Sequence, residues 1–222
     1  MAQRGGTGQT MQERAEATRE LLLRSAAHLF EQHGFAGTSI SDISRRSGLT
    51  SGAVYFHYAN KENLAVAVVE EHFAGWPPLI GRIAASPAPA LDKLVFLGFE
   101  VARAFRDDIL VRAGSRLWTE RKAIRAPLPV PFVGWIDTVQ ALLEQGRDQG
   151  DVAPDVDCAA AASVLVCAFF GTHTVSDALD GRARIEQRVA DLWLLFLPAL
   201  RPRTAPADLV RRARDRTGTV RA

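Results

Sequence analysis

Four ring-bearing side chains stand next to one another in the sequence, followed at a short distance by a lysine: Tyr55, Phe56, His57, Tyr58 and Lys61. Tyrosine, histidine and lysine side chains can donate hydrogen bonds, and lysine adds a positive charge, so the cluster has the chemistry to bind phosphate groups. Consecutive residues of an α-helix point in all directions around its axis, so they cannot all face one core. We therefore expect some of these rings to meet solvent or a partner.

Residue types that support catalysis or metal binding occur elsewhere, but no pattern is complete. His173 and Asp177 are four residues apart, which places two possible metal ligands on one helix face, yet no third ligand is evident. The run of Glu70, Glu71 and His72 lacks the spacing of helical metal sites. No G-x-S-x-G elbow, P-loop or dinucleotide fingerprint occurs. We expect no enzymatic activity, no cofactor and no metal.

The composition is that of an ordinary soluble protein. The chain has 222 residues, 47% of them hydrophobic, and its net charge of +2 permits nucleic-acid binding without arguing for it. The N-terminus has no apolar signal region, and the longest apolar stretch, 158–170, is shorter than the roughly 20 residues of a membrane span. Cys158 and Cys167 are too far apart on one helix to form a disulfide, and we expect both to be buried. These features predict a cytoplasmic protein without membrane contact.

Hydrophobic periodicity predicts an all-α protein of nine or ten helices. Residues 1–12 are Gly-rich and polar and predict a disordered tail, and a first helix over 13–33 ends at Gly34. The basic segment 201–222 predicts a C-terminal tail that is either a short solvated helix or mobile. The remaining helices are predicted over 39–48, 50–57, 61–76, 90–106, 108–122, 131–149, 156–178 and 182–199.

Two of these helices are short and meet at a glycine. Ser39 followed by Asp42 is a capping-box pattern, Gly48 ends the first short helix, and Thr50 is a good N-cap for the second. Two short helices joined by a Gly-containing turn and packed on a longer helix form a helix-turn-helix. Its second helix begins with small residues, whose free N–H groups favour phosphate. From spacing alone, a plain helical hairpin packed through its aromatic rings remains the alternative.

Within the second short helix we expect the side chains to divide by type. Val54 and Phe56 have the apolar character to anchor the helix inwards. Tyr55 and His57 can donate to DNA phosphates, and Lys61 can add a charged contact.

Residues 14–64 resemble the DNA-binding domain of the Tet repressor family of bacterial regulators. The resemblance is carried by Phe30, Gly34, Phe35 and Thr38, and by the segment ISDISRRSGLTSGAVYFHYANKENL. It implies a helix-turn-helix domain over 13–60 and a ligand-binding and dimerisation domain over 61–200. The DNA-binding residues that it implies are Thr38, Ser39, Ser41, Thr50, Ser51, Gly52, Ala53, Tyr55, His57 and Lys61.

One residue departs from the pattern of the similar subfamily. The position of Ser51 is commonly lysine there, which reaches a guanine edge, whereas serine is too short for a bidentate guanine contact. We expect the operator preference at that base pair to shift or weaken, by about 1–3 kcal/mol per lost contact. Arg45 and Arg46 either compensate or form a solvated face.

Segments beyond residue 64 are similar to γ-butyrolactone autoregulator receptors of antibiotic-producing actinomycetes: RAGSRL (112–117), PLPVPFVGW (127–135) and LVCAFFGTHTVSD (165–177). AVAVVEEHFAGWP (65–77) and AFRDD (104–108) are closer to the branch that senses furan-type or butenolide signals. The resemblance implies a largely apolar ligand pocket. Its candidate lining residues are His72, Phe73, Trp76, Phe99, Trp118, Phe132, Trp135 and Phe169, with Trp135 the strongest.

Core packing is the alternative for each of these aromatic residues except Trp135, and a surface position is the alternative for His72. Furan-type relatives can carry tyrosine at the positions of Phe73 and Phe132 and glutamine at that of Trp118. This chain lacks those polar groups, so we expect a neutral lactone or butenolide ligand rather than a carboxylate.

The resemblance also implies partners and a mechanism. Helices 156–178 and 182–199 would form a four-helix interface in a homodimer that binds a pseudo-palindromic operator in double-stranded DNA. Ligand binding would displace the helix 61–76 and release the DNA, giving a ligand-responsive repressor of antibiotic genes or of its own promoter. The alternatives are a repressor of an efflux gene, a pseudo-receptor that binds several ligands weakly, and a helical enzyme or carrier that never meets DNA.

Overall fold

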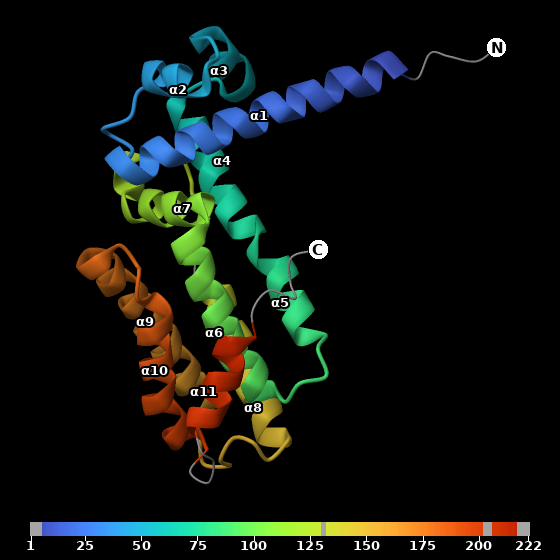
Figure 1. The fold of residues 1–222 in the computed structure, drawn as a ribbon, viewed down its shortest axis with the longest axis vertical. Coiled ribbons are helices and arrows are strands. Elements are labelled where there is room, and N and C mark those ends of the chain that lie inside the picture. The colour runs from blue at the N-terminus through green and yellow to red at the C-terminus, as the bar shows by residue number, and fades with distance from the viewer. Residues whose placement is uncertain (1–5, 130–131, 202–205, 217–222) are drawn as a thin grey trace, which may run out of the picture. The chain divides into compact units, whose positions relative to one another are not determined.

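The computed structural model describes residues 6–129, 132–201 and 206–216, with side chains from residue 11 onward. Within these ranges the chain forms eleven α-helices, one short 3₁₀ helix and no strand, which confirms the predicted all-α class (Figure 1). The helices are α1 (Gly6–His33), α2 (Ile40–Ser47), α3 (Ser51–Tyr58), α4 (Lys61–Ala74), α5 (Trp76–Ala84), α6 (Ala90–Asp107), α7 (Ile109–Thr119), η1 (Arg121–Ala123), α8 (Val133–Asp148), α9 (Cys158–Asp180), α10 (Ile185–Leu200) and α11 (Pro206–Asp215).

The chain folds into two compact units that alternate along the sequence. Unit 1 comprises Met1–Trp76 and Ile109–Pro129, and unit 2 comprises Pro77–Asp108 and Val130–Ala222. This division differs from the predicted boundary after residue 60, because α4 and α7 share one hydrophobic core with the first three helices. The predicted boundary followed the end of the short helices and not the packing.

Unit 1 is organised around the second half of α1. Phe30 on α1, Ile43 on α2 and Val54 on α3 are fully or almost fully buried in one core, together with Leu64 on α4 and Leu117 on α7. Burying each such side chain contributes about 1.5–3 kcal/mol, which fixes the short helices α2 and α3 against α1. Neither short helix is long enough to be stable by itself in water.

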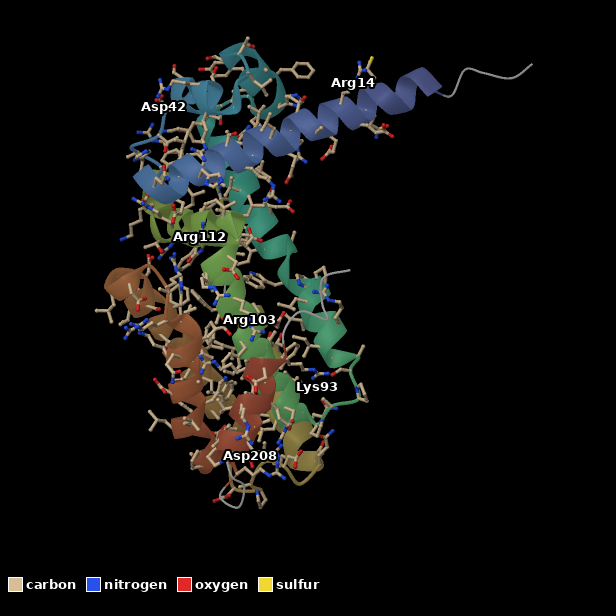
Figure 2. All side chains as sticks on the ribbon, in the orientation of Figure 1. Arg14, Asp42, Lys93, Arg103, Arg112 and Asp208 are labelled. Atoms are coloured by element: carbon tan, nitrogen blue, oxygen red, sulfur yellow. The ribbon has the colours of Figure 1, made fainter. Side chains whose placement is uncertain are left out.

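The helix α1 begins earlier than the predicted tail allows. It starts at Gly6, whereas residues 1–12 were expected to be disordered; residues 1–5 lie outside the described part of the chain. No proline interrupts residues 6–13, and helix formers such as Gln9 and Met11 let the hydrogen-bond ladder continue outward. From residue 11 to residue 17 the side chains of α1, including that of Arg14, are exposed (Figure 2).

A helix that the periodicity did not predict follows Gly75. The predicted helix 61–76 ends at Ala74, and α5 starts at Trp76 and contains Pro77 and Pro78 in its first turn. Proline is tolerated there because the first N–H groups of a helix have no partner within that helix. Lys93 ties the end of α5 to α6, since its buried Nζ donates to the carbonyl of Ala84 at 2.8 Å.

Unit 2 packs α8, α9, α10 and α11 around or beside α6. Gly98 on α6 allows the buried indole of Trp193 on α10 to approach closely, because a Cβ atom at Gly98 would lie 2.9 Å from Nε1. Phe99 and Leu143 are fully buried in the same unit. An ion-pair network reinforces this packing, in which Arg103 of α6 binds Glu186 of α10 at 3.0 Å.

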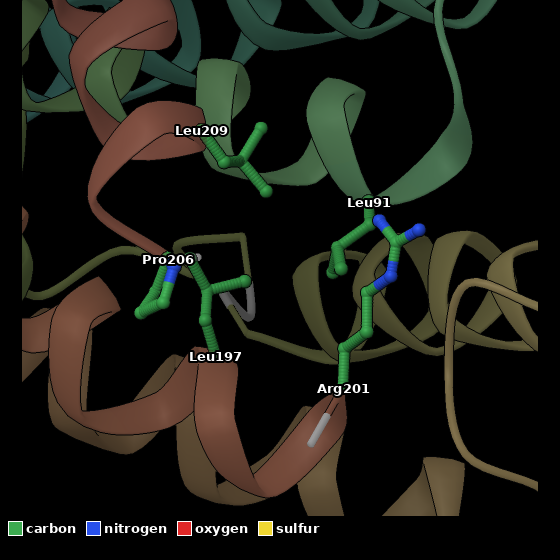
Figure 3. A pocket seen from close by; sticks show the side chains of 5 residues that line it. All are labelled: Leu91, Leu197, Arg201, Pro206 and Leu209. Carbon is green, nitrogen blue, oxygen red and sulfur yellow. The ribbon is translucent and has the colours of Figure 1, made fainter. Parts of the chain in front are cut away.

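The predicted C-terminal tail contains a packed helix. On α11 the residues Leu209, Val210 and Ala213 form an i, i+1, i+4 stripe and are buried. Leu209 faces Leu91 and Leu197 across a small apolar pocket (Figure 3). The arginines of α11 remain at the surface. The composition therefore indicated a solvated tail, whereas the spacing of three apolar residues determined the packing.

A chain that ends at Arg201 should therefore be less stable than the full chain by about 3–6 kcal/mol, because two large apolar side chains of α11 lose their buried positions. Urea unfolding followed by circular dichroism measures this difference. Arg211→Gln is the matched control, since the exposed Arg211 forms an ion pair within α11, with Asp208. Equal stability of the shortened and full chains would show that α11 does not support unit 2.

Candidate functional site

The first short helix of the candidate site is fixed by its caps. The hydroxyl oxygen of Ser39 accepts the N–H of Asp42 at 3.2 Å, and the Asp42 carboxylate accepts the N–H of Ser39 at 3.2 Å, which confirms the predicted capping box. Hydrogen bonds from the Ser39 side chain and backbone lower the pKa of Asp42, and Arg45 adds to this effect. Gly48 ends α2 with a φ of 72°, a left-handed conformation that glycine adopts without strain.

The turn between the two short helices is closed by side-chain hydrogen bonds. Ser44 of α2 donates to the carbonyl oxygen of Leu49, and the hydroxyl oxygen of Thr50 accepts the N–H of Ala53 at 3.2 Å. Thr50 is therefore the N-cap of α3, as predicted. The helix N-terminus at Ser51 and Gly52 carries the positive end of the helix dipole.

The helix α3 has one inward and one outward face. Val54 and Tyr58 are buried, whereas Tyr55 is 53% exposed and Phe56 is 85% exposed. The expectation that Phe56 anchors α3 inwards is therefore wrong, and Tyr58 takes that role. The physical reason is the helical period: residues 54 and 58 are four apart and share a face, whereas residue 56 points to the opposite side.

Tyr58 holds α3 against α1. Its hydroxyl donates to the carbonyl oxygen of Arg19 at 3.1 Å, and the Arg19 guanidinium lies 5.8 Å from the ring centroid. Burial raises the pKa of Tyr58 to about 12, so the side chain stays protonated and remains a donor at neutral pH. The contribution of this group to stability is complete below pH 10 and is lost as the pH rises from 10 towards 12, because only the unfolded state ionises in that window.

Most of the predicted DNA contacts lie at the surface around α3. Ser39, Ser41, Thr50, Gly52 and Tyr55 are exposed, and Ser51, Ala53 and His57 are half-buried. Phe56 was not among the predicted contacts, although its ring is in edge-to-face contact with His57 at 5.1 Å. The exposed face of α3 thus combines small residues at its start with two exposed rings one turn later.

Two predicted DNA contacts are engaged inside the protein. Thr38 is only 2% exposed and its hydroxyl donates to the carbonyl oxygen of Gly34 at 2.9 Å. A DNA contact by Thr38 stays a prediction that its burial does not favour. The half-buried Lys61 donates to the carbonyl oxygens of Phe35 and Thr38, each at 2.9 Å. A DNA contact by Lys61 stays a prediction, because an ammonium group carries three donors.

Positive charge accumulates where α1 and α2 meet. Arg45 and Arg46 of α2 are exposed, and Arg45 forms an ion pair with Asp42. Burial lowers the pKa of His28 on α1, and the positive charges of Arg46 and Arg112 lower it further. His28 is therefore neutral at physiological pH, and the local charge comes from the arginines.

The predicted ligand contacts in unit 1 surround the end of α4. His72 is 7% exposed, which contradicts its interpretation as a surface residue. Its ring meets Phe73 at 4.9 Å and Trp76 at 5.5 Å, both edge to face. A Cβ atom at Gly114 of α7 would lie 2.4 Å from the Cβ of His72, so glycine is what allows α4 and α7 to cross there.

Trp118 at the end of α7 is the fourth predicted ligand contact in unit 1. Its indole N–H donates to the carbonyl oxygen of Pro129 at 3.2 Å, and the Arg121 guanidinium lies 4.1 Å from the ring centroid. The half-buried indole therefore links α7 to the proline-rich segment 125–131, of which residues 130–131 lie outside the described part.

The predicted ligand contacts in unit 2 fall into two groups. Phe132, Trp135 and Phe169 are half-buried, and Phe132 meets the ring of Phe170 edge to face at 4.9 Å. Phe170 was not predicted, although it directly follows Phe169. Phe99 has no exposed surface, which fits the alternative of core packing for this residue.

His173 and Asp177, the two possible metal ligands, both bind Arg182. Arg182 donates to Nδ1 of His173 at 3.3 Å and forms an ion pair with Asp177 at 3.0 Å. His173 is buried and stacks on Phe105 at a centroid distance of 3.7 Å. Among the described residues, no group of three or more histidine, cysteine or acidic residues is placed to hold a metal ion.

The last two long helices present an exposed apolar face. Its exposed residues on α9 and α10 are Val164, Val175, Leu179, Leu194 and Leu195. Cys167 is also exposed, which corrects the prediction that both cysteines are buried; Cys158 is buried as predicted. Among the described residues, α9 is the one helix long and apolar enough to cross a bilayer; 22% of its apolar window is buried, and length and composition alone are weak evidence for a membrane span.

Comparisons with known proteins match both parts of the chain. A family model described as bacterial regulatory proteins, tetR family, matches residues 22–68, and one described as a Tetracyclin repressor-like C-terminal domain matches residues 88–202. The A-factor receptor protein of Streptomyces griseus is 35% identical over 189 residues, which cover 85% of this chain and 66% of the relative.

Two solved structures are similar over most of the chain. One, from work on the molecular basis for control of antibiotic production by bacterial hormones, is 43% identical with a TM-score of 0.77 and covers 83% of this chain and 98% of that chain. The other is a γ-butyrolactone receptor described as ArpA-like, 33% identical with a TM-score of 0.79, covering 92% of this chain and all of its own (100%).

Proposed function

The chain belongs to the tetR family of bacterial regulatory proteins, and from this membership we propose that it is a repressor released from DNA by a small diffusible autoregulator. The repressor acts as a cytoplasmic homodimer on a pseudo-palindromic operator. The single observation that carries the proposal is the outward face of α3, where a capped helix N-terminus lies one turn from exposed Tyr55 and Phe56.

This face has what major-groove recognition requires. Ser51 and Gly52 at the start of α3 allow close approach of the backbone, and the N–H groups there attract phosphate. Tyr55 can donate to a phosphate, and the ring of Phe56 can make an apolar contact with a thymine methyl group. Serine at position 51 cannot make a bidentate guanine contact, so we propose a weaker base preference at that position than a lysine would give.

The homodimer is supported by the exposed apolar face of α9 and α10. Five aliphatic side chains remain exposed there in the single chain, and they are grouped on two helices, whereas exposed apolar residues of a monomer are usually scattered singly. A two-fold interface through these helices would bury them and would present two copies of α3 to successive major-groove faces about 34–36 Å apart, or at a multiple of that spacing.

The ligand class is proposed from the residue types at three predicted ligand contacts, each considered within its own unit. The half-buried Phe73, Trp118 and Phe132 supply apolar surface without a hydroxyl or amide at those positions, which favours a neutral lactone or butenolide with an alkyl chain. Among the similar proteins, one is an A-factor receptor and another a γ-butyrolactone receptor. Control of antibiotic biosynthesis is proposed from the similarity to the structure that is 43% identical.

Release is proposed to act through α4. Lys61 at its start contacts the loop before α2, and His72 near its end contacts the aromatic residues proposed to meet the ligand. A ligand that favours a displaced α4 by a few kcal/mol shifts the population to a state that no longer fits the operator.

A gel-shift titration tests the proposal. The protein should bind a palindromic fragment from upstream of its own gene with an affinity that falls steeply as salt rises, because phosphate contacts release counterions. A γ-butyrolactone or butenolide should then release the DNA, whereas the corresponding open-chain carboxylate should not. Salt-independent or absent DNA binding would contradict the repressor, and DNA binding that no lactone reverses would contradict the ligand class.

A further inference from the structure

The loop between α1 and α2 receives a carboxylate from the end of α7. Glu120, the residue after α7, accepts the N–H of Phe35 through Oε2 at 2.7 Å. All of these elements belong to unit 1, and Phe35 is buried. A hydrogen bond between a backbone N–H and an ionised carboxylate is among the stronger ones in proteins.

The backbone before Phe35 is shaped for this carboxylate. Gly34 has a φ of 71°, and a Cβ atom there would lie 2.5 Å and 2.7 Å from the two carboxylate oxygens of Glu120. Glycine is therefore needed for its conformation and, separately, for the space that Glu120 occupies. Any other residue would displace the carboxylate from the N–H of Phe35.

A carboxylate at this place works against the helix dipole, since the C-terminal end of α1 is the negative end. Arg116 offsets this cost. Its Nε donates to Glu120 at 3.0 Å, and its Nη1 donates to the carbonyl oxygen of Glu31 in the last turn of α1. The Glu120 side chain is therefore held in one specific position, because Gly34 leaves the space for it and Arg116 compensates its charge.

Phe35 is also bound from α4. Lys61 Nζ donates to the carbonyl oxygen of Phe35 at 2.9 Å and lies 4.2 Å from the centroid of the Phe35 ring. The carbonyl oxygen of Thr38 accepts a second bond from the same ammonium group at 2.9 Å. The N–H of Phe35 is thus bound by the carboxylate of Glu120, and its carbonyl oxygen is bound by the ammonium group of Lys61.

We propose that Glu120 and Lys61 form a two-sided clamp on Phe35 that sets the position of α2 and α3. Through this clamp, a displacement between α4 and α7 is transmitted to α3. The clamp residues are positioning residues: Glu120 acts on DNA only through the loop. The inference rests on the proposed function for its regulatory role. The mechanical part is independent of DNA and ligand, because it concerns the mobility of the loop in the free protein.

The test uses Glu120, because Lys61 is also a predicted DNA contact. In the full-length protein without DNA or ligand, Glu120→Ala should speed amide hydrogen exchange of Phe35 and of the first turn of α2 by tenfold or more, since it removes a charged hydrogen bond. Glu120→Gln keeps one acceptor oxygen and should restore most of the protection. Glu20→Gln is the control, because Glu20 forms an exposed ion pair with Arg24 within α1, a kind of pair that contributes little to stability.

Two further measurements test the regulatory role. Without ligand, the operator affinity of Glu120→Ala should fall roughly tenfold. The operator affinity without lactone divided by that with lactone should fall towards one. The lactone affinity of the DNA-free protein should be unchanged. Unchanged exchange at Phe35 in Glu120→Ala would overturn the clamp. Faster exchange in Glu120→Ala with an unaltered ratio of operator affinities would overturn the role of the clamp in release. A wild-type protein that binds no operator would refute the proposed function, and hydrogen exchange at Phe35 would still test the clamp by itself.

Discussion

Gly52→Glu should weaken operator binding at least 100-fold while leaving the protein as stable as before or slightly more stable. Gly52 is exposed at the second position of α3, and a Cβ atom there meets only the Thr50 hydroxyl, at 3.7 Å. A carboxylate in the first turn favours the helix by about 0.3–1 kcal/mol through the dipole. The same carboxylate would face the DNA phosphates, where like charges cost several kcal/mol.

Fluorescence anisotropy with a labelled operator measures the affinity, and thermal unfolding of the same samples measures stability. Gly134→Glu is the matched control: Gly134 is the second residue of α8, is exposed, and has no atom near its missing Cβ. The control should bind the operator like wild type. If Gly52→Glu retained full affinity, α3 would not be the element that enters the groove.

Gly114→Ala should destabilise the protein by about 1–3 kcal/mol, although alanine normally stabilises a helix relative to glycine by about 0.5–1 kcal/mol. The added Cβ atom would lie 2.4 Å from the Cβ and 2.7 Å from the Cγ of His72, so α7 and α4 would have to separate. Both helices contribute to the core of unit 1, and the cost therefore spreads to the residues that support α2 and α3.

Urea unfolding of Gly114→Ala and Gly81→Ala measures this difference. Gly81 lies inside α5, is exposed, and has open space at its Cβ position, so Gly81→Ala should be stabilising. Opposite signs for the same substitution would establish that the contact with His72, and not helix propensity, determines the effect. A stabilising Gly114→Ala would show that α4 and α7 tolerate a wider separation.

The local signals in the sequence predicted the helix-turn-helix well. Ser39, Asp42 and Thr50 act within four residues of their partners, so their capping hydrogen bonds could be inferred from spacing. Residue type alone misled for Phe56, because the apolar character of a ring does not determine the direction in which a helix points it. Applying the four-residue period to Val54 would have identified Tyr58 as its inward neighbour.

The features that the sequence did not predict depend on contacts between distant residues. The burial of His72 follows from Gly114, 42 residues later along the chain, and the position of Glu120 follows from Gly34. No local pattern connects these pairs. The helix α11 is a different case, because its apolar stripe of Leu209, Val210 and Ala213 was visible but was outweighed by the arginines around it.

The alternation of the two units has a consequence for engineering. The chain passes from one unit to the other three times, after Trp76, after Asp108 and after Pro129. A chimera that takes only the first 60 residues onto a different sensor would leave Phe35 without Glu120 and the α1 core without α7. A chimera that keeps the operator specificity of this chain therefore has to include residues 109–129 as well as the N-terminal segment, because both belong to unit 1.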